Sequence, residues 1–375
     1  MKILAIETSC DETGISIIDA IGTINAGNIQ FTVLADTLSS QAELHSEYGG
    51  VYPTLAKREH TKALPLLLEQ ALGLANTHGD TLTMSGIDAI AVTHGPGLEP
   101  ALWTGITFAE ELAKEYNLPI IPVNHMEGHI YSTLIESEDA ITYKLRTITY
   151  PALALLISGG HTDMTLIKNA FDYEYLGSTL DDAVGEAFDK VARMLGLSYP
   201  GGPIISKLAQ EARAEGTDST DTGKALPRPM VHSGDYNFSF SGLKTAVLYK
   251  VKQLKKDLSL EENNNLPDEI IKSIAMQFED ACADVLASKV SKAMQEYDIE
   301  TLIIGGGVAA NSHINKTLRK RLKTDAIDNL LILTPAKGLT GDNALMIAAA
   351  GYLRALRGEH LTDLTELKAR GKLKL

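Results

Sequence analysis

The chain has 375 residues, of which 44% are hydrophobic and 22% are charged, a composition typical of a soluble globular protein with two or three domains. Its net charge of −14 argues against a protein that binds nucleic acid on its own. No apolar run approaches the roughly 20 residues that span a bilayer, and the N-terminus turns acidic too early for a signal peptide. The two cysteines, Cys10 and Cys282, form no spacing motif, so we expect a cytoplasmic protein without a membrane partner.

Strand-like and helix-like segments alternate along the whole chain, which predicts an α/β fold. Residues 3–19 and 152–168 share one layout, an apolar run, a polar turn and a second apolar run, as in a β-hairpin. Turns this rich in hydroxyls, acids or Gly-Gly are typical of loops that hold a phosphate. Two such hairpins indicate a duplicated domain with a cleft between the copies, although chance likeness within an α/β chain would also explain them.

Between the hairpins, residues 87–98 predict a strand that runs into a turn and a helix, and HMEGH then places His125 and His129 four residues apart. On a helix these side chains lie one above the other, so both imidazoles could bind one metal ion. The zinc-protease motif H-E-x-x-H has its Glu beside the first ligand, whereas Glu127 points to the other side of the helix, which disfavours peptide hydrolysis. Without a third ligand, a pair of exposed or capping histidines is the alternative.

The stretch 181–197 predicts an amphipathic helix in the second half of the chain. Its apolar stripe comprises Val184, Ala187, Phe188, Val191 and Leu195, and its polar face comprises Asp182, Glu186, Asp189 and Arg193. Residues 199–203 (YPGGP) predict a tight turn. Residues 215–267 are polar and irregular, with FSFSGLKTA embedded, and indicate an inserted lobe.

Residues 305–310 (GGGVAA) match the weak dinucleotide pattern G-x-G-x-x-A. A Rossmann unit also needs an acid at the end of the next strand, but Asp325 and Asp328 precede that strand, so hydride chemistry is disfavoured. A ribose or base could still pass close to these glycines. Asp342 opens an apolar helix, where a helix N-cap is the plain interpretation. With His125 and His129 it would complete a facial triad suited to Fe(II) or Zn(II).

These motifs, in this order, resemble the family of tRNA threonylcarbamoyladenosine transferases (TsaD), formerly described as glycoproteases, within the actin, Hsp70 and sugar-kinase superfamily. The resemblance covers nearly the whole chain, through IETSCDETG, GGVYPTLAKREH, GPGL, HMEGH, LLISGGHT, AVGEAFDKVARMLGL, YPGGP, FSFSGLKTA, GGGVAAN and GDNALMIA. It implies a duplicated actin-like fold of two lobes with a central cleft. Residues 1–148 and 345–375 would form the first lobe, and 149–344 the second, with a helical insertion around 215–267.

By this resemblance, His125, His129 and Asp342 bind one divalent metal, usually described as iron(II), with zinc(II) or magnesium(II) as alternatives. The substrate threonylcarbamoyl-AMP would be held by Leu156, Ile157, Ser158, Gly159, Gly160, Asp189, Gly202 and Asn311. Leu156 stands where archaeal and eukaryotic members carry a metal-binding tyrosine, which is the bacterial pattern. Glu12, in the first hairpin turn, is the candidate general base from its position, and a plain turn acid is the alternative.

The implied reaction transfers a threonylcarbamoyl group to the exocyclic amine of the adenosine beside the anticodon, in tRNAs that read codons beginning with A, and AMP leaves. The implied partners are tRNA, a TsaB-like paralogous protein and a TsaE-like ATPase, and a homodimer stays open. Because the chain is acidic, contact with tRNA must be local or shared with a partner. Basic runs occur at 57–60, 319–323 and 368–375, although such runs are more often solvated helix faces.

Three rival functions stay open on the sequence. An actin-fold kinase or ATPase would share the hairpins and the cleft but would not need the HxxxH pair. A non-catalytic Hsp70-like or scaffolding binder would need neither the two histidines nor Asp342. A metalloprotease would require a glutamate at a different place in HMEGH.

Overall fold

The computed structural model describes residues 1–24, 27–76, 82–217, 223–261, 263–325, 327, 330–361 and 363–375. Asp328 and parts of the predicted insertion at 215–267 lie outside these residues. The chain forms two compact units. Unit 1 comprises Met1–Ile148 and Thr334–Leu375, and unit 2 comprises Thr149–Leu333. Each unit has its own sheet and its own hydrophobic core.

Within the described residues, the sheet of unit 1 has seven strands in the order β5-β4-β1-β2-β3-β7-β6. In chain order they are β1 (Lys2–Glu7), β2 (Glu12–Ile21), β3 (Gln30–Ser40), β4 (Ala89–Gly95), β5 (Ile120–Asn124), β6 (Ile135–Ser137) and β7 (Thr142–Leu145). Strands β1, β4 and β5 run parallel, whereas β2 and β3 are antiparallel to their neighbours. The central strand β1 is buried from its second residue onward, as expected of a strand that helices cover on both faces.

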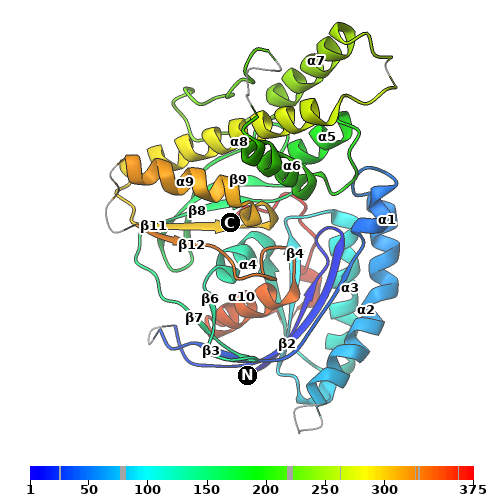
Figure 1. Ribbon diagram of the computed structural model, residues 1–375. Helices are drawn as coiled ribbons and strands as arrows, with labels where there is room; N and C mark the ends of the chain where they lie inside the picture. Colours follow the sequence, from blue (N-terminus) through cyan, green and yellow to red (C-terminus); the bar gives the residue numbers. More distant parts are fainter. Residues whose placement is uncertain are drawn as a thin grey trace. The chain divides into compact units, whose positions relative to one another are not determined.

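Helices cover both faces of this sheet. The helices that do so are α2 (Pro53–Ala75), α3 (Glu99–Tyr116), α4 (His125–Ser132) and α10 (Ala344–Leu356). The described part of the unit also contains the short helix α1 (Ala42–Ser46) and the 3₁₀ turns η2 (Met84–Gly86) and η5 (Leu364–Glu366). Figure 1 shows α2 and α3 side by side on one face, and α10 with α4 on the other. Gly351 permits the close approach of α10, because a Cβ there would lie 2.6 Å from the Cβ of Ala91 in β4.

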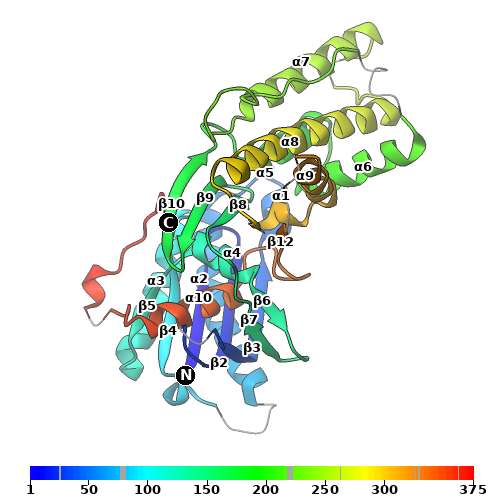
Figure 2. The same cartoon turned by 90° about the vertical axis from the view of Figure 1, so that its left-hand side faces the viewer.

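The sheet of unit 2 has, within the described residues, five strands in the order β10-β9-β8-β11-β12. These are β8 (Ala152–Ile157), β9 (Thr162–Asn169), β10 (Asp172–Ser178), β11 (Thr301–Gly305) and β12 (Leu331–Leu333). The helices are α5 (Val184–Met194), α6 (Gly201–Glu215), α7 (Ser241–Asp257), α8 (Asp268–Glu296) and α9 (Ser312–Thr324), with the 3₁₀ turn η4 (Gly307–Ala310). Figure 2 shows the stack of α5, α6, α7 and α8 on one side of the strands.

Both units repeat one strand order. The order β3-β2-β1-β4-β5 in unit 1 corresponds to β10-β9-β8-β11-β12 in unit 2, with the same antiparallel and parallel pairings. The two predicted hairpins are β1–β2 and β8–β9, and they open the two sheets. The prediction of a duplicated α/β fold of the actin type is therefore confirmed. The cleft between the halves stays a prediction.

The amphipathic helix predicted in unit 2 is α5, and all five residues of its apolar stripe are buried. Asp182 differs from the prediction, because it precedes the helix and forms ion pairs with Lys190 (2.6 Å) and Lys244 (2.8 Å). A carboxylate two residues before a helix is free to reach across to a neighbouring helix, here α7.

The segment 215–267 is more ordered than its composition indicates. It contains α7, whose buried residues Leu243, Val247 and Val251 recur every four positions between lysines, so that the apolar stripe is only one side chain wide. Phe238 and Phe240 are fully buried and belong to the main core of unit 2. The described part of this segment therefore packs as part of the unit.

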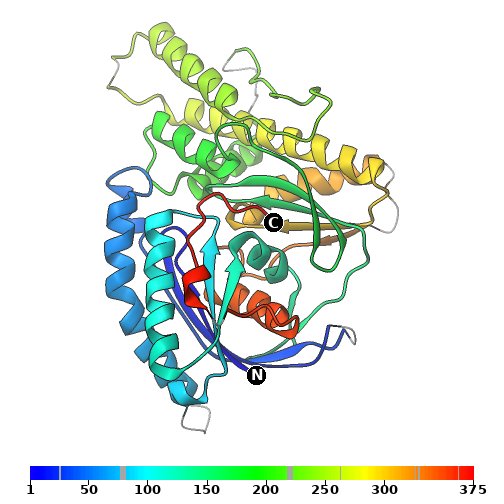
Figure 3. The same cartoon turned by 180° about the vertical axis from the view of Figure 1, so that it is seen from behind.

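The C-terminal segment of unit 1 returns to the sheet after α10. In Figure 3 it runs from α10 through η5 and on past the ends of β4 and β5. The backbone N–H of Arg370 donates to the carbonyl of His94 in β4 (2.8 Å), and Leu361 pairs with Ile120 in β5. Leu361 thus lies at the start of β5, whereas the Arg370 contact and a hydrogen bond from Nδ2 of Asn124 to the carbonyl of Lys374 (3.1 Å) bring the last residues of the chain to the strand ends that precede α3 and α4.

Candidate functional site

The two histidines of HMEGH lie on α4, which begins directly after β5. The side chain of Asn124 caps this helix by accepting a hydrogen bond from the N–H of Met126 (2.9 Å). His125 and His129 are one helical turn apart, with ring centroids 4.6 Å from each other. Both are buried, so neither is a solvated surface histidine. The helical pair predicted from the sequence is confirmed.

Asp342 precedes α10, and the packing of α10 on α4 brings it to the histidines. Gly128 makes this possible, because a Cβ there would lie only 3.0 Å from Ile347 and 3.1 Å from Met346 of α10. The Oδ1 atom of Asp342 is 3.1 Å from Nε2 of His129 and 3.4 Å from Nε2 of His125. The helix N-cap is Asn343, which accepts from the N–H of Met346, so Asp342 does not serve as the cap.

The three side chains fit a divalent cation. One ligand atom from each of His125, His129 and Asp342 lies within 4.8 Å of the other two. Neither ring nitrogen of the fully buried His129 has a hydrogen bond of proper geometry to the described residues, although Nε2 is 3.1 Å from Asp342. An orphaned buried imidazole is costly unless a ligand satisfies it. Two imidazoles and one carboxylate are the donor set of a facial triad.

A buried carboxylate, Glu7 at the end of β1, orients His125. Its Oε2 atom lies 3.2 Å from Nδ1 of His125 and accepts a hydrogen bond from Oγ1 of Thr93 (2.6 Å). Its Oε1 atom accepts from the N–H of Ser9 (2.5 Å). When the ring proton is on Nδ1, facing Glu7, Nε2 is available to bind a cation. A carboxylate beside a metal-binding histidine commonly fixes the tautomer in this way.

The charges of this cluster stabilise one another. Burial by itself would lower the pKa of His125, but Asp342 and Glu7 raise that pKa well above its ordinary value. Burial also opposes ionisation of Asp342, yet His125 and His129 hold the pKa of its carboxyl well below its ordinary range. Without a metal, the directions of these shifts favour a protonated His125 between the carboxylates of Glu7 and Asp342. A bound cation would take the place of that positive charge.

Glu127 takes no part in this cluster. Its Oε2 atom accepts a hydrogen bond from Nε of Arg354 on α10 (2.5 Å), and its side chain is 1% exposed. The acid inside HMEGH therefore holds α4 against α10. The geometry of a zinc protease, which needs this acid beside the metal, is absent from the described site.

Glu12 begins β2 in the same unit. Burial, followed by the charges of Asp342 and Asp11, raises the pKa of Glu12 to about 9. His60 of α2 contacts the chain on both sides of Glu12. Its Nδ1 atom lies 2.7 Å from Oγ1 of Thr13, and its Nε2 atom lies 3.0 Å from the carbonyl oxygen of Cys10 in the preceding turn. The hairpin turn is therefore braced from the side of α2.

In unit 2 the predicted substrate loop follows β8. Leu156 and Ile157 are fully buried strand residues, so their side chains cannot touch a ligand. Gly159 and Gly160 are exposed, and a Cβ on either would meet no atom within 4 Å. The carbonyl of Ser158 accepts from the N–H of Gly185 in the first turn of α5 (3.3 Å). The exposed loop thus lies at the N-terminus of a helix, which favours anions.

Asp189, Gly202 and Asn311 converge on the first turns of α6. Oδ1 of Asp189 accepts from the N–H of Gly201 (2.7 Å), and Nδ2 of Asn311 donates to Ser206 (2.8 Å). The second proton of Nδ2 goes to Oε1 of Glu279 (2.7 Å), and Oδ1 of Asn311 caps α9. Gly202 has open space where a Cβ would be. The structure therefore gathers these three residues, with the Asn311 amide already hydrogen-bonded.

The glycine turn at 305–310 adjoins the substrate loop. Gly306 has φ +90°, and a Cβ there would lie 2.4 Å from the carbonyl oxygen of Ile157, so only glycine fits. The turn continues as the 3₁₀ helix η4 rather than directly as an α-helix. It therefore differs from a Rossmann turn, in agreement with the missing ribose acid.

A family model described as TsaD, tRNA N6-adenosine threonylcarbamoyltransferase, matches residues 32–349. The chain belongs to this family. Relatives named tRNA N6-adenosine threonylcarbamoyltransferase include one from Persephonella marina, 43% identical over 94% of this chain and 90% of that protein. Another, from Listeria welshimeri, is 42% identical over 95% of this chain and 92% of that protein. The resemblance seen in the motifs is confirmed.

Two solved structures align with this TsaD-family chain along most of its length. The activator of 2-hydroxyisocaproyl-CoA dehydratase from Clostridium difficile, with bound ADPNP, aligns with a TM-score of 0.46 and 14% identity over 96% of both chains. HypF from T. kodakarensis aligns with a TM-score of 0.49 and 14% identity, over 95% of this chain and 49% of that one. In the described residues, no helix has both the length and the apolar character that a membrane crossing requires.

Four residues of the site were missed in the sequence: Glu7, Ser9, Thr93 and Asn124. Glu7, Thr93 and Asn124 lie at or near the carboxyl ends of the adjacent parallel strands β1, β4 and β5. A polar residue that closes an apolar strand is the signal that could have found them, because parallel strands bring such residues to one edge of a sheet.

Proposed function

We propose that this chain transfers the threonylcarbamoyl group from threonylcarbamoyl-AMP to the exocyclic amine of the adenosine beside the anticodon, in tRNAs that read codons beginning with A. The observation that carries the proposal is the family match over residues 32–349, in a chain whose His125, His129 and Asp342 form a compact donor set. The reaction is acyl transfer, in which the amine nitrogen forms a bond to the carbamoyl carbon and AMP leaves with the electron pair of the broken bond.

His125, His129 and Asp342 are proposed to hold one divalent cation, with iron(II) as the first candidate and zinc(II) or magnesium(II) as the alternatives. When bound, such a cation supplies a Lewis acid that polarises the carbamoyl carbonyl. The two imidazoles favour iron or zinc over magnesium, which prefers oxygen ligands. The side chain of Asp342 is 18% exposed while both histidines are buried, so access to the site is from the Asp342 side.

The unit 2 residues are proposed to bind the adenylate. In the stretch Ser158, Gly159 and Gly160, the backbone N–H groups of the two glycines would hold its phosphate at the N-terminus of α5, because the N–H of Ser158 already donates to the carbonyl of His161 (2.9 Å). Leu156 and Ile157 would contribute only main-chain atoms, since their side chains are buried. Gly202 leaves room for the ribose or base, and Asp189 and Asn311 shape the same surface through their bonds to α6.

Glu12 is proposed as the group that takes the proton from the adenosine amine. A carboxyl with a pKa of about 9 is protonated at neutral pH and cannot accept a proton. One of the charges that raise this pKa is that of Asp342, so cation binding to Asp342 would favour the ionised carboxylate. Glu12→Gln should then lower kcat for transfer without changing the affinity for the adenylate.

We further propose that the chain acts with a TsaB-like paralogous protein and a TsaE-like ATPase. Its net charge of −14 opposes binding of a polyanion to the isolated chain at physiological salt. Partners that add positive surface would offset this repulsion. Tight binding of tRNA to the isolated chain at that salt concentration would argue against the need for partners.

The test is a reconstitution with tRNA, threonine, bicarbonate, ATP, an adenylate-forming enzyme and the two partners, with the nucleosides of digested tRNA read by mass spectrometry. The native chain should yield threonylcarbamoyladenosine, and His129→Ala should yield little. The matched control is His232→Ala, since His232 is an exposed histidine of unit 2 and its loss should change nothing. No product with the native chain, despite a verified adenylate supply, would refute the proposed function.

A further inference from the structure

The C-terminal residues form a one-sided basic ribbon. Lys368, Arg370, Lys372 and Lys374 are exposed, and we call these four the C-terminal basic strip. The alternate residues point inward, with Leu367 3% exposed and part of the unit 1 core, and Ala369 packed against that core. The alternation means that the positive face is built by packing and is not a loose tail.

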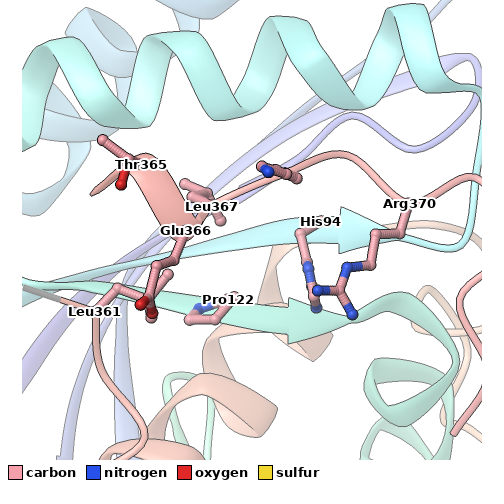
Figure 4. A pocket seen from close by; sticks show the side chains of 8 residues that line it. His94, Pro122, Leu361, Thr365, Glu366, Leu367 and Arg370 are labelled. Carbon is pink, nitrogen blue, oxygen red and sulfur yellow. The ribbon is translucent and has the colours of Figure 1, made fainter. Parts of the chain in front are cut away.

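Hydrogen bonds tie the strip to the strand ends of unit 1. The N–H of Arg370 donates to the carbonyl of His94 (2.8 Å), and the N–H of Gly97 donates to the carbonyl of Gly371 (3.2 Å). Gly95 must be a glycine here, because a Cβ on it would lie 2.1 Å from the carbonyl oxygen of Arg370. Figure 4 shows the side chains of Arg370 and His94 side by side at the end of β4.

Three cations of the strip, Lys368, Arg370 and Lys372, have no ion-pair partner among the described residues of the unit. Two acids border the strip: Glu99 is next to Gly371, and Glu366 lines a cavity of about 470 Å³ together with Lys368 and Arg370. Lys368, Arg370 and Lys372 therefore present uncompensated cations in a protein that is strongly acidic.

The strip ends beside the metal centre of the same unit. Nδ2 of Asn124 donates to the carbonyl of Lys374 (3.1 Å). Asn124 also caps α4 and directly precedes His125, so a single residue joins the end of the strip to the helix that carries both histidines. A polyanion lying on the strip would thus be held next to the site where chemistry is proposed.

We propose that the C-terminal basic strip binds the sugar-phosphate backbone of the tRNA substrate and holds the target adenosine near the metal centre. This inference rests on the proposed function, which supplies an RNA substrate. Charge complementarity and the continuity with α4 argue for RNA phosphates. Phosphate contacts of this kind position a nucleic acid without reading its sequence. The strip would therefore serve every tRNA that the enzyme modifies.

The experiment measures binding of labelled tRNA by fluorescence anisotropy, across a salt series, to the full chain with its partners. The test variant is Lys368→Gln, Arg370→Gln and Lys372→Gln combined. The matched control is Arg319→Gln, Lys320→Gln and Lys323→Gln, which removes three exposed cations from α9 and causes the same change of net charge. Thermal melting of both variants verifies that they are folded.

We expect the strip variant to lower the slope of log affinity against log salt by about 2 to 3, because each of the three lost phosphate contacts contributes about 0.7 to 0.9 to the slope. If the variant and the native chain bind equally at 1 M salt, this change of slope corresponds to an affinity loss of about 100- to 500-fold at 0.1 M. In the transfer assay its KM for tRNA should rise while kcat at saturating tRNA is kept. The α9 control should retain the native slope.

Several results would overturn the inference. Equal losses in the strip variant and the α9 control would reduce the effect to net charge. Native tRNA binding in a strip variant that no longer associates with the partner proteins would assign the strip to an acidic protein surface. Absence of tRNA binding by the native assembly at low salt would also refute it. Failure of the proposed function would give a different result, in which the native assembly binds tRNA but forms no threonylcarbamoyladenosine.

Discussion

Replacing Glu7 by Gln tests whether the carboxylate behind His125 sets the metal affinity. Glutamine keeps the size of the side chain and can still accept the hydrogen bond of Thr93 Oγ1, which now reaches Glu7 Oε2 at 2.6 Å. It removes the negative charge that faces Nδ1 of His125 at 3.2 Å. The imidazole then faces a neutral acceptor, which can still hold the Nδ1 proton but no longer raises the basicity of the ring through its charge.

The size of the effect follows from this contact. Glu7 is 0% exposed, so solvent does not screen its charge. A hydrogen bond to a charged group contributes about 1.5 to 3 kcal/mol. At about 1.4 kcal/mol for each tenfold change, this corresponds to an affinity loss of about 10- to 100-fold, the range seen when carboxylates behind metal-bound histidines are replaced.

Zinc(II) titration in competition with a chromophoric chelator measures this affinity directly and independently of catalysis. Glu7→Gln should weaken binding within that range, and His129→Ala should weaken it further. Glu43→Gln, which removes an exposed acid from α1, is the control that should match the native chain. If Glu7→Gln bound zinc(II) within twofold of the native chain while His129→Ala lost it, the contribution of the Glu7 carboxylate charge to the metal affinity would be refuted.

Two further predictions concern stability. Burial, with the charges of Arg354 and Arg370, lowers the pKa of His94 to about 4, so the unfolded chain takes up a proton near pH 6.5 that the folded chain refuses. The free energy of unfolding should therefore fall as pH drops from about 6.5 to about 4, by at most about 3 kcal/mol, and His94→Gln should flatten this decline in urea titrations. Phe240→Ala should destabilise the protein by about 3 to 5 kcal/mol, because Phe240 is fully buried and stacks on Phe238 with ring centroids 6.4 Å apart. Tyr249→Ala, at an exposed position of α7, should cost under about 0.5 kcal/mol, and similar losses in both variants would contradict the packing of this segment.

Local pattern was enough for several parts of the site. The spacing of His125 and His129 places both on one face of a helix whatever surrounds it, because the α-helical period puts residues i and i+4 together. The same period excluded Glu127 from that face, and the structure pairs Glu127 with Arg354. The apolar stripe of α5 was readable for the same reason, since five residues recur at helical spacing.

Other parts depended on contacts that no local pattern contains. The family resemblance implied a helical insertion around 215–267, but the polar composition of this segment concealed the position of α7, because its apolar stripe is one residue wide, is diluted by lysines and gains stability only against the core of unit 2. The sequence could suggest Asp342 as a third ligand but could not show that it reaches the histidines, because its approach to His129 depends on Gly128 allowing α10 to pack on α4.

The sequence by itself thus determined the α/β class, the two hairpins, the histidine pair and the family, because each can be recognised from short-range periodicity or from motifs. Only the tertiary structure decided that Glu7 and Thr93 lie behind His125, that the amide of Asn311 is already hydrogen-bonded to Glu279, and that the last basic residues end beside α4. The physical reason is that parallel strands and packed helices bring together residues that are 32 to 250 positions apart in these contacts, and such contacts are set by the core as a whole.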